Sequence, residues 1–395
     1  MVLGLKPVPE SDKSCLADYC RIIYILRISA RICGADVTDP NYRLNLVTYI
    51  LFTFICNFFI CTIYTMYRGV SNEGGYTVIL QVICFVGPAV QGTVKLICFI
   101  NYPETLRISQ SFLHETYKQY EQREPHYVQA LQQSIEVTRT FIRVIMYTYI
   151  AVVICLIGFP LVYYLIYKQR IFMMQFLLPG VDPYSSHGYL VLSCIQACSI
   201  CFGGFGNFGS DMYVVIFIGN VSMIKNVLGC KLLDLNAQLD AGASRAEVVA
   251  AMRDIVRWHM EYLNMLTRMQ LICFWIIVAM VGCSAVSILA TMYCMLIGVW
   301  PAAPILLLFS FMNLYMYCGL GTMVDKANIE CADVIYTQCH WYKLPVMEQR
   351  FILLMLRKAQ NTSSLTVGSM LPLTVGTGLQ LTKAVYSLVM LLMRE

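Results

Sequence analysis

Apolar residues gather along the chain into seven runs of about twenty residues or more, the length that a helix needs to cross a bilayer. The runs are 44–67, 76–100, 141–167, 189–218, 271–297, 301–323 and 365–393. The long polar connections, which alternate with short ones, are 101–140, 219–270 and 324–364. The pattern predicts an all-α membrane protein with seven transmembrane helices and with its two ends on opposite sides of the membrane.

The last run, 365–393, differs from a helix that faces lipid all round, because it carries hydroxyls, glycines, an amide and one cation, Lys383. Such groups need protein or water beside them. As one continuous helix, the run would align a half-polar stripe: Thr366, Ser369, Leu373, Thr377, Gln380, Ala384 and Ser387. A polar stripe that narrows onto Tyr386 and Val389 near the outer end indicates a pore wall with an apolar constriction. The alternative is a face of small residues that packs against other helices.

Segment 16–33 is too short and too basic to span a membrane, but its apolar residues recur at helical spacing. These residues are Leu16, Tyr19, Ile22, Ile23 and Leu26. Arg27 and Arg31 share another face. The pattern predicts an amphipathic helix in the inner membrane interface. An ordinary cytosolic amphipathic helix is the alternative.

Two further helices are expected in the polar connections. Ser244 and Glu247 have the spacing of a capping box, which opens a helix. Apolar positions then recur every three or four residues into the fifth span: Val248, Met252, Ile255, His259, Tyr262, Leu266 and Met269. A second amphipathic helix is expected from Pro345 to Lys358. We therefore expect the fifth and sixth spans to continue beyond the membrane as packed helices, with apolar stripes that contact other subunits.

The composition fits a membrane protein, since 58% of residues are hydrophobic and only 13% are charged. Soluble domains carry about 25% charged residues. Of the 28 Lys and Arg residues, 22 lie in the N-terminal segment (1–43), in 101–143 and in the other two long connections, which predicts that these parts are cytoplasmic. The expected organisation is a cytoplasmic N-terminus (1–43), six spans with their loops (44–323), cytoplasmic anchor helices (324–364) and an outward-leading seventh span (365–395).

Cysteine and glycosylation patterns agree with this orientation. None of the 18 cysteines lies in an outer connection, so no disulfide framework is expected. The two N-x-S/T sequons, at Asn220 and Asn361, fall on the predicted cytoplasmic side, where they would stay bare.

The chain contains no set of residues that predicts an enzyme, a cofactor or a metal centre. Gly204-Phe-Gly-Asn-Phe-Gly209 matches a dinucleotide fingerprint, but it lies inside the fourth run without a preceding strand, which favours close helix packing. Cys331, Cys339 and His340 lack a fourth ligand at zinc spacing. Asp211, in the inner half of the fourth run, must find a partner or water.

Several short motifs lie in the last 70 or so residues. They are Asp333-Val-Ile-Tyr336, Trp341, Pro345, Arg350 to Arg357, Gln360, Leu365-Thr-Val-Gly368 and Tyr386-Ser387. This pattern resembles the signature of insect odorant receptors, and Phe159-Pro160 and 178–183 resemble the end of the third span and the second outer loop of that family. Because no long insertion precedes the fifth span, the chain resembles an odorant-specific subunit rather than the larger shared co-receptor.

The resemblance implies a subunit of a ligand-gated, non-selective cation channel in the plasma membrane of a sensory neuron dendrite. It implies four subunits, with the shared co-receptor among them, each giving its last helix to a central pore and its cytosolic helices to an anchor. Tyr386 and Val389 match the constriction positions of the family, and Gln380 and Lys383 lie on the same helix. The implied partners are a volatile odorant, the co-receptor and membrane lipid, without nucleic acid.

The family binds volatile ligands within the outer halves of spans two to six. This chain offers there a mostly aromatic and apolar set: Gln81, Phe85, Phe159, Tyr163, Ile195, Gln196, Ser199 and Phe202. Such a lining suits a small uncharged molecule, held by dispersion and by a single hydrogen bond. Plain helix packing is the alternative for each of these residues.

Two other classes are weighed against the channel subunit. A seven-helix chemoreceptor of the G-protein-coupled type would carry its basic residues on the opposite side, and the chain has neither Asp-Arg-Tyr nor Asn-Pro-x-x-Tyr. A membrane transporter would be expected to show internal repeats and paired broken helices, and no repeat is detected.

Overall fold

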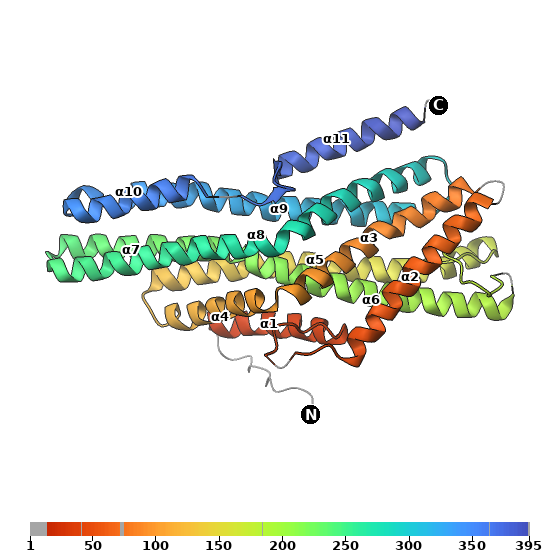
Figure 1. The fold of residues 1–395 in the computed structure, drawn as a ribbon, viewed down its shortest axis with the longest axis horizontal. Coiled ribbons are helices and arrows are strands. Elements are labelled where there is room, and N and C mark those ends of the chain that lie inside the picture. The colour runs from red at the N-terminus through yellow and green to blue at the C-terminus, as the bar shows by residue number, and fades with distance from the viewer. Residues whose placement is uncertain (1–13, 41, 72–74, 184, 363, 394–395) are drawn as a thin grey trace.

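The computed structural model describes residues 14–40, 42–71, 75–183, 185–362 and 364–393, which form an elongated bundle of helices (Figure 1). The helices are α1 (Cys15–Ile32), α2 (Leu46–Ser71), α3 (Tyr76–Asn101), α4 (Pro103–Tyr120), α5 (Pro125–Tyr167), α6 (Ser186–Gly219), α7 (Val221–Asp240), α8 (Arg245–Leu296), α9 (Ala303–Thr337), η1 (Trp341–Lys343), α10 (Val346–Gln360) and α11 (Val375–Leu392). An antiparallel ribbon of β1 (Thr366–Val367) and β2 (Leu371–Pro372) precedes α11.

Seven helical segments within the described ranges are long and apolar enough to cross a membrane. They begin with α2, α3, α5, α6, α8, α9 and α11, so six of them coincide with the first six runs expected from the sequence. The predicted all-α class with seven membrane helices is confirmed. The side of the membrane on which each end lies stays a prediction.

The longest helix, α8, runs for 52 residues and joins the two ends of the bundle. At its start the Ser244 hydroxyl accepts a hydrogen bond from the Glu247 N–H, and the Glu247 carboxylate accepts one from the Ser244 N–H, so the capping box is confirmed. The predicted apolar stripe is buried throughout: Val248, Met252, Ile255, His259, Tyr262, Leu266 and Met269. The fifth span therefore continues as a packed helix well beyond its most apolar part.

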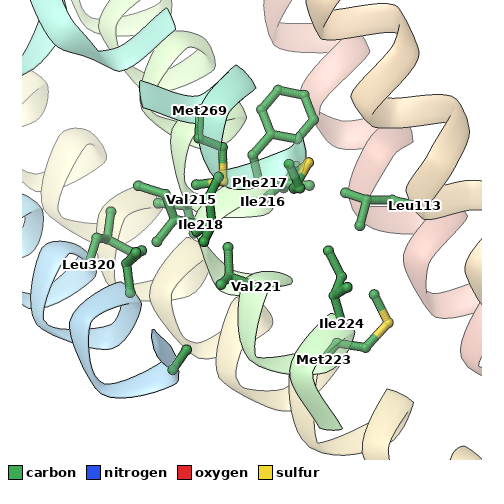
Figure 2. Close-up of a cluster of buried hydrophobic side chains, with 14 of the residues drawn as sticks. Leu113, Val215, Ile216, Phe217, Ile218, Val221, Met223, Ile224, Met269 and Leu320 are labelled. Carbon is green, nitrogen blue, oxygen red and sulfur yellow. The ribbon is translucent and has the colours of Figure 1, made fainter. Parts of the chain in front are cut away.

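Where α6 meets α7, residues 211–221 are all buried. Figure 2 shows apolar side chains of α4, α6, α7, α8 and α9 in this region: Leu113, Val215, Ile216, Phe217, Ile218, Val221, Met223, Ile224, Met269 and Leu320. Asn220 joins the two helices, and its side chain accepts from the Tyr117 hydroxyl at 2.7 Å and donates to the Ile216 carbonyl at 2.7 Å. Burial raises the pKa of Tyr117, which keeps its hydroxyl protonated as a donor. Since Asn220 is buried, its sequon is inaccessible in the folded chain.

The α1 helix forms where the sequence predicts it, but its apolar face is covered by protein. Tyr19 is buried and stacks on Tyr117 of α4 with ring centroids 4.6 Å apart. Arg27 and Arg31 share another face, as expected, and both contact the carboxylate of Asp36, at 3.1 and 3.0 Å. The residues of the predicted apolar stripe thus pack on protein, and the position of this helix at the membrane interface stays a prediction. Aromatic stacking and the ion pairs hold α1 against the bundle.

The last apolar run is not one helix. Gly368 and Ser369 both adopt positive φ, at 58° and 60°, and Pro372 has no N–H to donate to a helix. The chain therefore turns through the β1–β2 ribbon, and α11 begins only at Val375. The expected continuous helix over 365–393 is wrong in its first ten residues, and the expected polar stripe is limited to the part within α11.

Candidate functional site

An apolar cavity of about 190 Å³ lies between α1, α2, α3, α5, α6 and α9. Phenylalanines contribute much of its wall: Phe54, Phe58, Phe85, Phe99, Phe202, Phe205 and Phe309. An engineered apolar cavity of about 150 Å³ is large enough to bind benzene. The space therefore fits a small organic molecule with one ring, held mainly by dispersion.

Glycines on α6 create part of this space. A Cβ added at Gly203 would meet no atom within 4 Å, whereas one at Gly204 would lie 2.9 Å from Cγ2 of Val153 on α5. Further along, a Cβ at Gly209 would lie 3.0 Å from Oγ of Ser29 on α1. The glycine-rich motif thus provides close helix packing, as predicted. It also lines the cavity, which the sequence analysis did not foresee.

Three of the eight predicted ligand-binding residues line the cavity. The Phe85 ring lies 5.3 Å from the Trp300 ring, and the Phe202 ring lies 5.2 Å from the Phe54 ring, measured between centroids. Ser199 lies on the same wall, and its hydroxyl donates to the carbonyl of residue 195 at 2.8 Å. With that donor occupied, the Ser199 oxygen is left to accept a hydrogen bond from a ligand.

The other five predicted residues lie outside the cavity wall. Gln81 donates to the Val299 carbonyl at 3.2 Å. Gln196 is fully buried, and its side chain accepts from the N–H of Met174 at 3.1 Å and donates to its carbonyl at 2.8 Å. The remaining three pack elsewhere in the bundle: Phe159, Tyr163 and Ile195. The two glutamines are thus structural groups, because they satisfy backbone atoms of the connections that cover this end.

A buried polar network lies beside the cavity. Nζ of Lys95 on α3 lies 2.5 Å from Oδ1 of Asp211 on α6, and both side chains are at most 1% exposed. Tyr149 of α5 donates to Oδ2 of Asp211 at 2.6 Å, and Tyr317 of α9 donates to Oδ1 at 2.6 Å. Lys95 also donates to Asn207 at 3.3 Å. Asp211 is thus paired with Lys95, as the sequence analysis expected of a buried carboxylate. The network joins α3, α5, α6 and α9.

This network forms a polar boundary to an otherwise apolar space. Tyr149 and Asn207 take part in it and also line the cavity. Burial of a charge is unfavourable unless the charge is paired and its remaining hydrogen-bonding positions are filled. Here the cation and the carboxylate are paired, and two tyrosine hydroxyls complete the carboxylate. A molecule in the cavity is therefore in contact with groups whose positions the ion pair determines.

The predicted pore residues lie on different faces of α11. Gln380, Lys383 and Tyr386 are exposed, whereas Val389 is fully buried in the chain's own core. The helix packs against α8 and α9, and the Tyr315 hydroxyl of α9 lies 3.1 Å from that of a threonine on α11. In the single chain the Val389 side chain faces the bundle, and its assignment to a pore constriction stays a prediction. The exposed face remains available for neighbours.

The α10 helix forms where Pro345 and the amphipathic pattern predict it. Only part of its apolar surface is covered. Ile352 and Met355 are buried, but a second set is exposed: Val346, Met347, Phe351, Leu353 and Leu354. A helix with an uncovered apolar face of this size is typical of a contact surface. The predicted contacts between subunits stay a prediction.

Comparison with known proteins agrees with this architecture. The family model described as 7tm Odorant receptor matches residues 76–386. Odorant receptor 83c of Drosophila melanogaster is 24% identical over 382 residues, which cover 92% of this chain and 94% of that protein. The insect olfactory receptor OR5 from Machilis hrabei, solved in complex with eugenol, matches with a TM-score of 0.77 at 13% identity, covering 95% of this chain and 99% of that one. A second OR5 structure matches with a TM-score of 0.75 and the same identity and coverage.

Proposed function

The chain belongs to the insect family of 7tm odorant receptors, and we propose that it is the odorant-binding subunit of a ligand-gated cation channel. The observation that carries this proposal is the apolar cavity of about 190 Å³ inside the bundle. Receptor channels of this family are not enzymes. We infer that the cavity takes a small, uncharged, volatile molecule, because its wall offers aromatic rings and few free polar groups.

The α9 helix links the proposed odorant site to the last helix. Leu306 and Phe309 lie in the cavity wall, and the Phe309 ring lies 5.2 Å from the Tyr149 ring of the polar network. Further along α9, Tyr315 contacts Thr382 of α11. A ligand shifts an equilibrium only by its differential affinity for the two states. We infer that an odorant favours the conformation in which α9, and with it α11, has moved.

The proposed channel is a hetero-oligomer with the shared co-receptor, with four subunits around one pore, in the plasma membrane of a sensory neuron dendrite. The uncovered faces of α10 and α11 support this assembly, since both are helices with exposed apolar residues. Gln380, Lys383 and Tyr386 are the residues we propose to face the pore. The exposed apolar surfaces of α2 and α5 are proposed to face lipid.

The test is electrical recording from cells that express the chain alone, the co-receptor alone, or both together. A panel of volatile molecules is applied while G-protein signalling is blocked. An odorant-evoked cation current that needs both subunits and survives the block supports the channel. A response that the block abolishes would support a G-protein-coupled receptor. Odorant-dependent uptake without current would favour a transporter.

A further inference from the structure

Three side chains with metal-ligating atoms meet at the end of the bundle remote from α11. Glu124 and His126 lie at the start of α5, and Asp234 lies on α7. Nε2 of His126 lies 3.5 Å from Oε2 of Glu124 and 3.3 Å from Oδ1 of Asp234. One ligand atom from each side chain lies within 4.8 Å of the other two. The cluster therefore converges on a single point between two helices.

The two distances from Nε2 of His126, 3.5 and 3.3 Å, match those between the ligands of a zinc ion. Ligand atoms at about 2.0–2.1 Å from a tetrahedral ion lie about 3.3–3.4 Å from one another. A good N–H···O hydrogen bond is shorter, at about 2.9 Å. Nε2 of His126 is shielded from solvent and has no hydrogen-bond partner among the described residues. An imidazole nitrogen placed between two carboxylates without a hydrogen bond is arranged as a metal ligand would be.

Neighbouring groups hold the ligands in position. The Tyr127 hydroxyl donates to Oδ2 of Asp234 at 2.5 Å, which leaves Oδ1 directed at His126. The imidazole also packs against the Tyr127 ring, with centroids 4.6 Å apart. Hydrogen bonds of this kind to a ligating carboxylate orient metal ligands in known sites. The cluster thus has both the ligands and the support that a metal site requires.

We propose that Glu124, His126 and Asp234 bind a divalent transition-metal cation of the zinc class, with water completing its coordination. One imidazole and two carboxylates suit Zn²⁺ better than Mg²⁺ or Ca²⁺, which prefer oxygen ligands alone. The side chains are partly exposed, so an ion can enter from solvent. The bound ion clamps the start of α5 to α7. This site is separate from the odorant cavity and does not depend on the proposed channel function.

A clamp of this kind stabilises the folded receptor, because an ion that binds only the folded state shifts the unfolding equilibrium by mass action. The test uses the purified full chain in lipid nanodiscs, stripped with a chelator and titrated with ZnCl₂. Calorimetry should show one saturable site per chain, and the unfolding temperature should rise with Zn²⁺. When Co²⁺ replaces Zn²⁺, the d–d absorption bands of the bound ion should appear in the visible spectrum.

Variants assign the binding to this cluster. His126→Gln and Asp234→Asn should abolish saturable binding and the thermal shift. Tyr127→Phe, which removes the supporting hydrogen bond, should weaken binding by roughly 10-fold. The matched control is His187→Gln, which removes an exposed histidine at the start of α6 and should leave binding intact.

Zinc binding that persists unchanged in His126→Gln would overturn the proposal, as would the lack of any saturable binding to the unmodified chain. In the second case, the three side chains are an ordinary polar cluster that holds no metal ion. If Asp234→Asn does not fold, Glu124→Gln decides the matter, because the Glu124 side chain is 66% exposed and its replacement is compatible with folding. Full binding by that folded variant would also overturn the proposed set of ligands.

Discussion

Two consecutive stretches of α6, 199–210 and 211–218, belong to two different regions of the molecule. From Ser199 to Ser210 the helix carries four glycines and lines the cavity, with open space beside Gly203. From Asp211 to Ile218 every residue is buried, and the aliphatic side chains near its end fill the core of Figure 2. Empty space removes packing contacts and so lowers stability. A receptor that keeps a cavity therefore needs a densely packed region next to it, and one continuous helix joins the two here.

The border between these regions is the network around Asp211. Lys95, Tyr149 and Tyr317 reach it from α3, α5 and α9. Three of these four residues lie behind the cavity wall, and Tyr149 lines it. The comparison teaches that the cavity is lined by small residues on the side of the glycines and bounded by paired charges on the side of Asp211.

The largest expected effect on stability comes from removing one charge of the Lys95–Asp211 ion pair. Asp211→Leu leaves the Lys95 charge buried without a partner, which should destabilise the fold by roughly 3–5 kcal/mol. The double variant Lys95→Met with Asp211→Leu removes both charges and should recover most of that loss. Both are measured by unfolding in detergent and by surface expression. Equal stability of the single and double variants would show that the ion pair does not hold the border.

The next effect concerns the open side. Phe202→Ala removes a ring from the cavity wall, and differences of about 1–3 kcal/mol, or 10–200-fold, are typical for apolar pockets. We expect the concentration for half-maximal odorant response to rise at least 10-fold, with unchanged surface expression. Phe159→Ala is the matched control, since Phe159 lies outside the wall. A larger loss from Phe159→Ala than from Phe202→Ala would show that the odorant binds outside this cavity, near the predicted residues that do not line it.

Most of the fold could be predicted from the sequence, because apolar runs and capping signals are local. The capping box at Ser244 and the amphipathic start of α10 are examples. The error in the last run has a local cause too, since Gly368 and Pro372 are visible breakers inside an apolar stretch. Apolar content alone decided in favour of a long helix there. The packing of α1 depended instead on partners distant in sequence, such as Tyr117, which periodicity does not reveal.

The site was less predictable, because an apolar residue that lines a cavity has the same periodicity as one that packs. Phe85, Ser199 and Phe202 were found as candidates, but Gln81 and Gln196 were not separable from them by sequence. Their partners are backbone atoms of connections that fold back onto the bundle. The proposed metal site was missed for a related reason: its ligands lie in separate connections, so no spacing in the sequence unites them.

A moderate effect distinguishes the two faces of α11. Val389→Ala removes two buried methyl groups, which at about 0.8 kcal/mol per group should lower the free energy of unfolding by about 1.6 kcal/mol or slightly more. Tyr386→Ala should leave stability nearly unchanged, because Tyr386 is exposed in the single chain. In the assembled channel, however, Tyr386→Ala should change cation permeability or basal leak. Altered permeability from Val389→Thr with normal stability would support Val389 as a pore residue, as the sequence predicts.

The smallest expected effect concerns the start of α8, and it tests whether the buried stripe of that helix depends on its N-cap. Ser244→Ala removes the N-cap of α8, a change that typically costs about 1 kcal/mol in helices. The first turn of α8 is exposed, and the following stripe from Val248 onward is buried, so the loss should remain local. Hydrogen exchange should quicken in that turn alone, with a small drop in unfolding temperature and an unchanged odorant response. Ala243→Ser, one residue before the cap, is the control and should have no such effect on exchange. Fast exchange as far as Tyr262 would mean that the cap, and not the buried stripe, stabilises this end of α8. Burial would then not distinguish a rigid region from the region that lines the cavity.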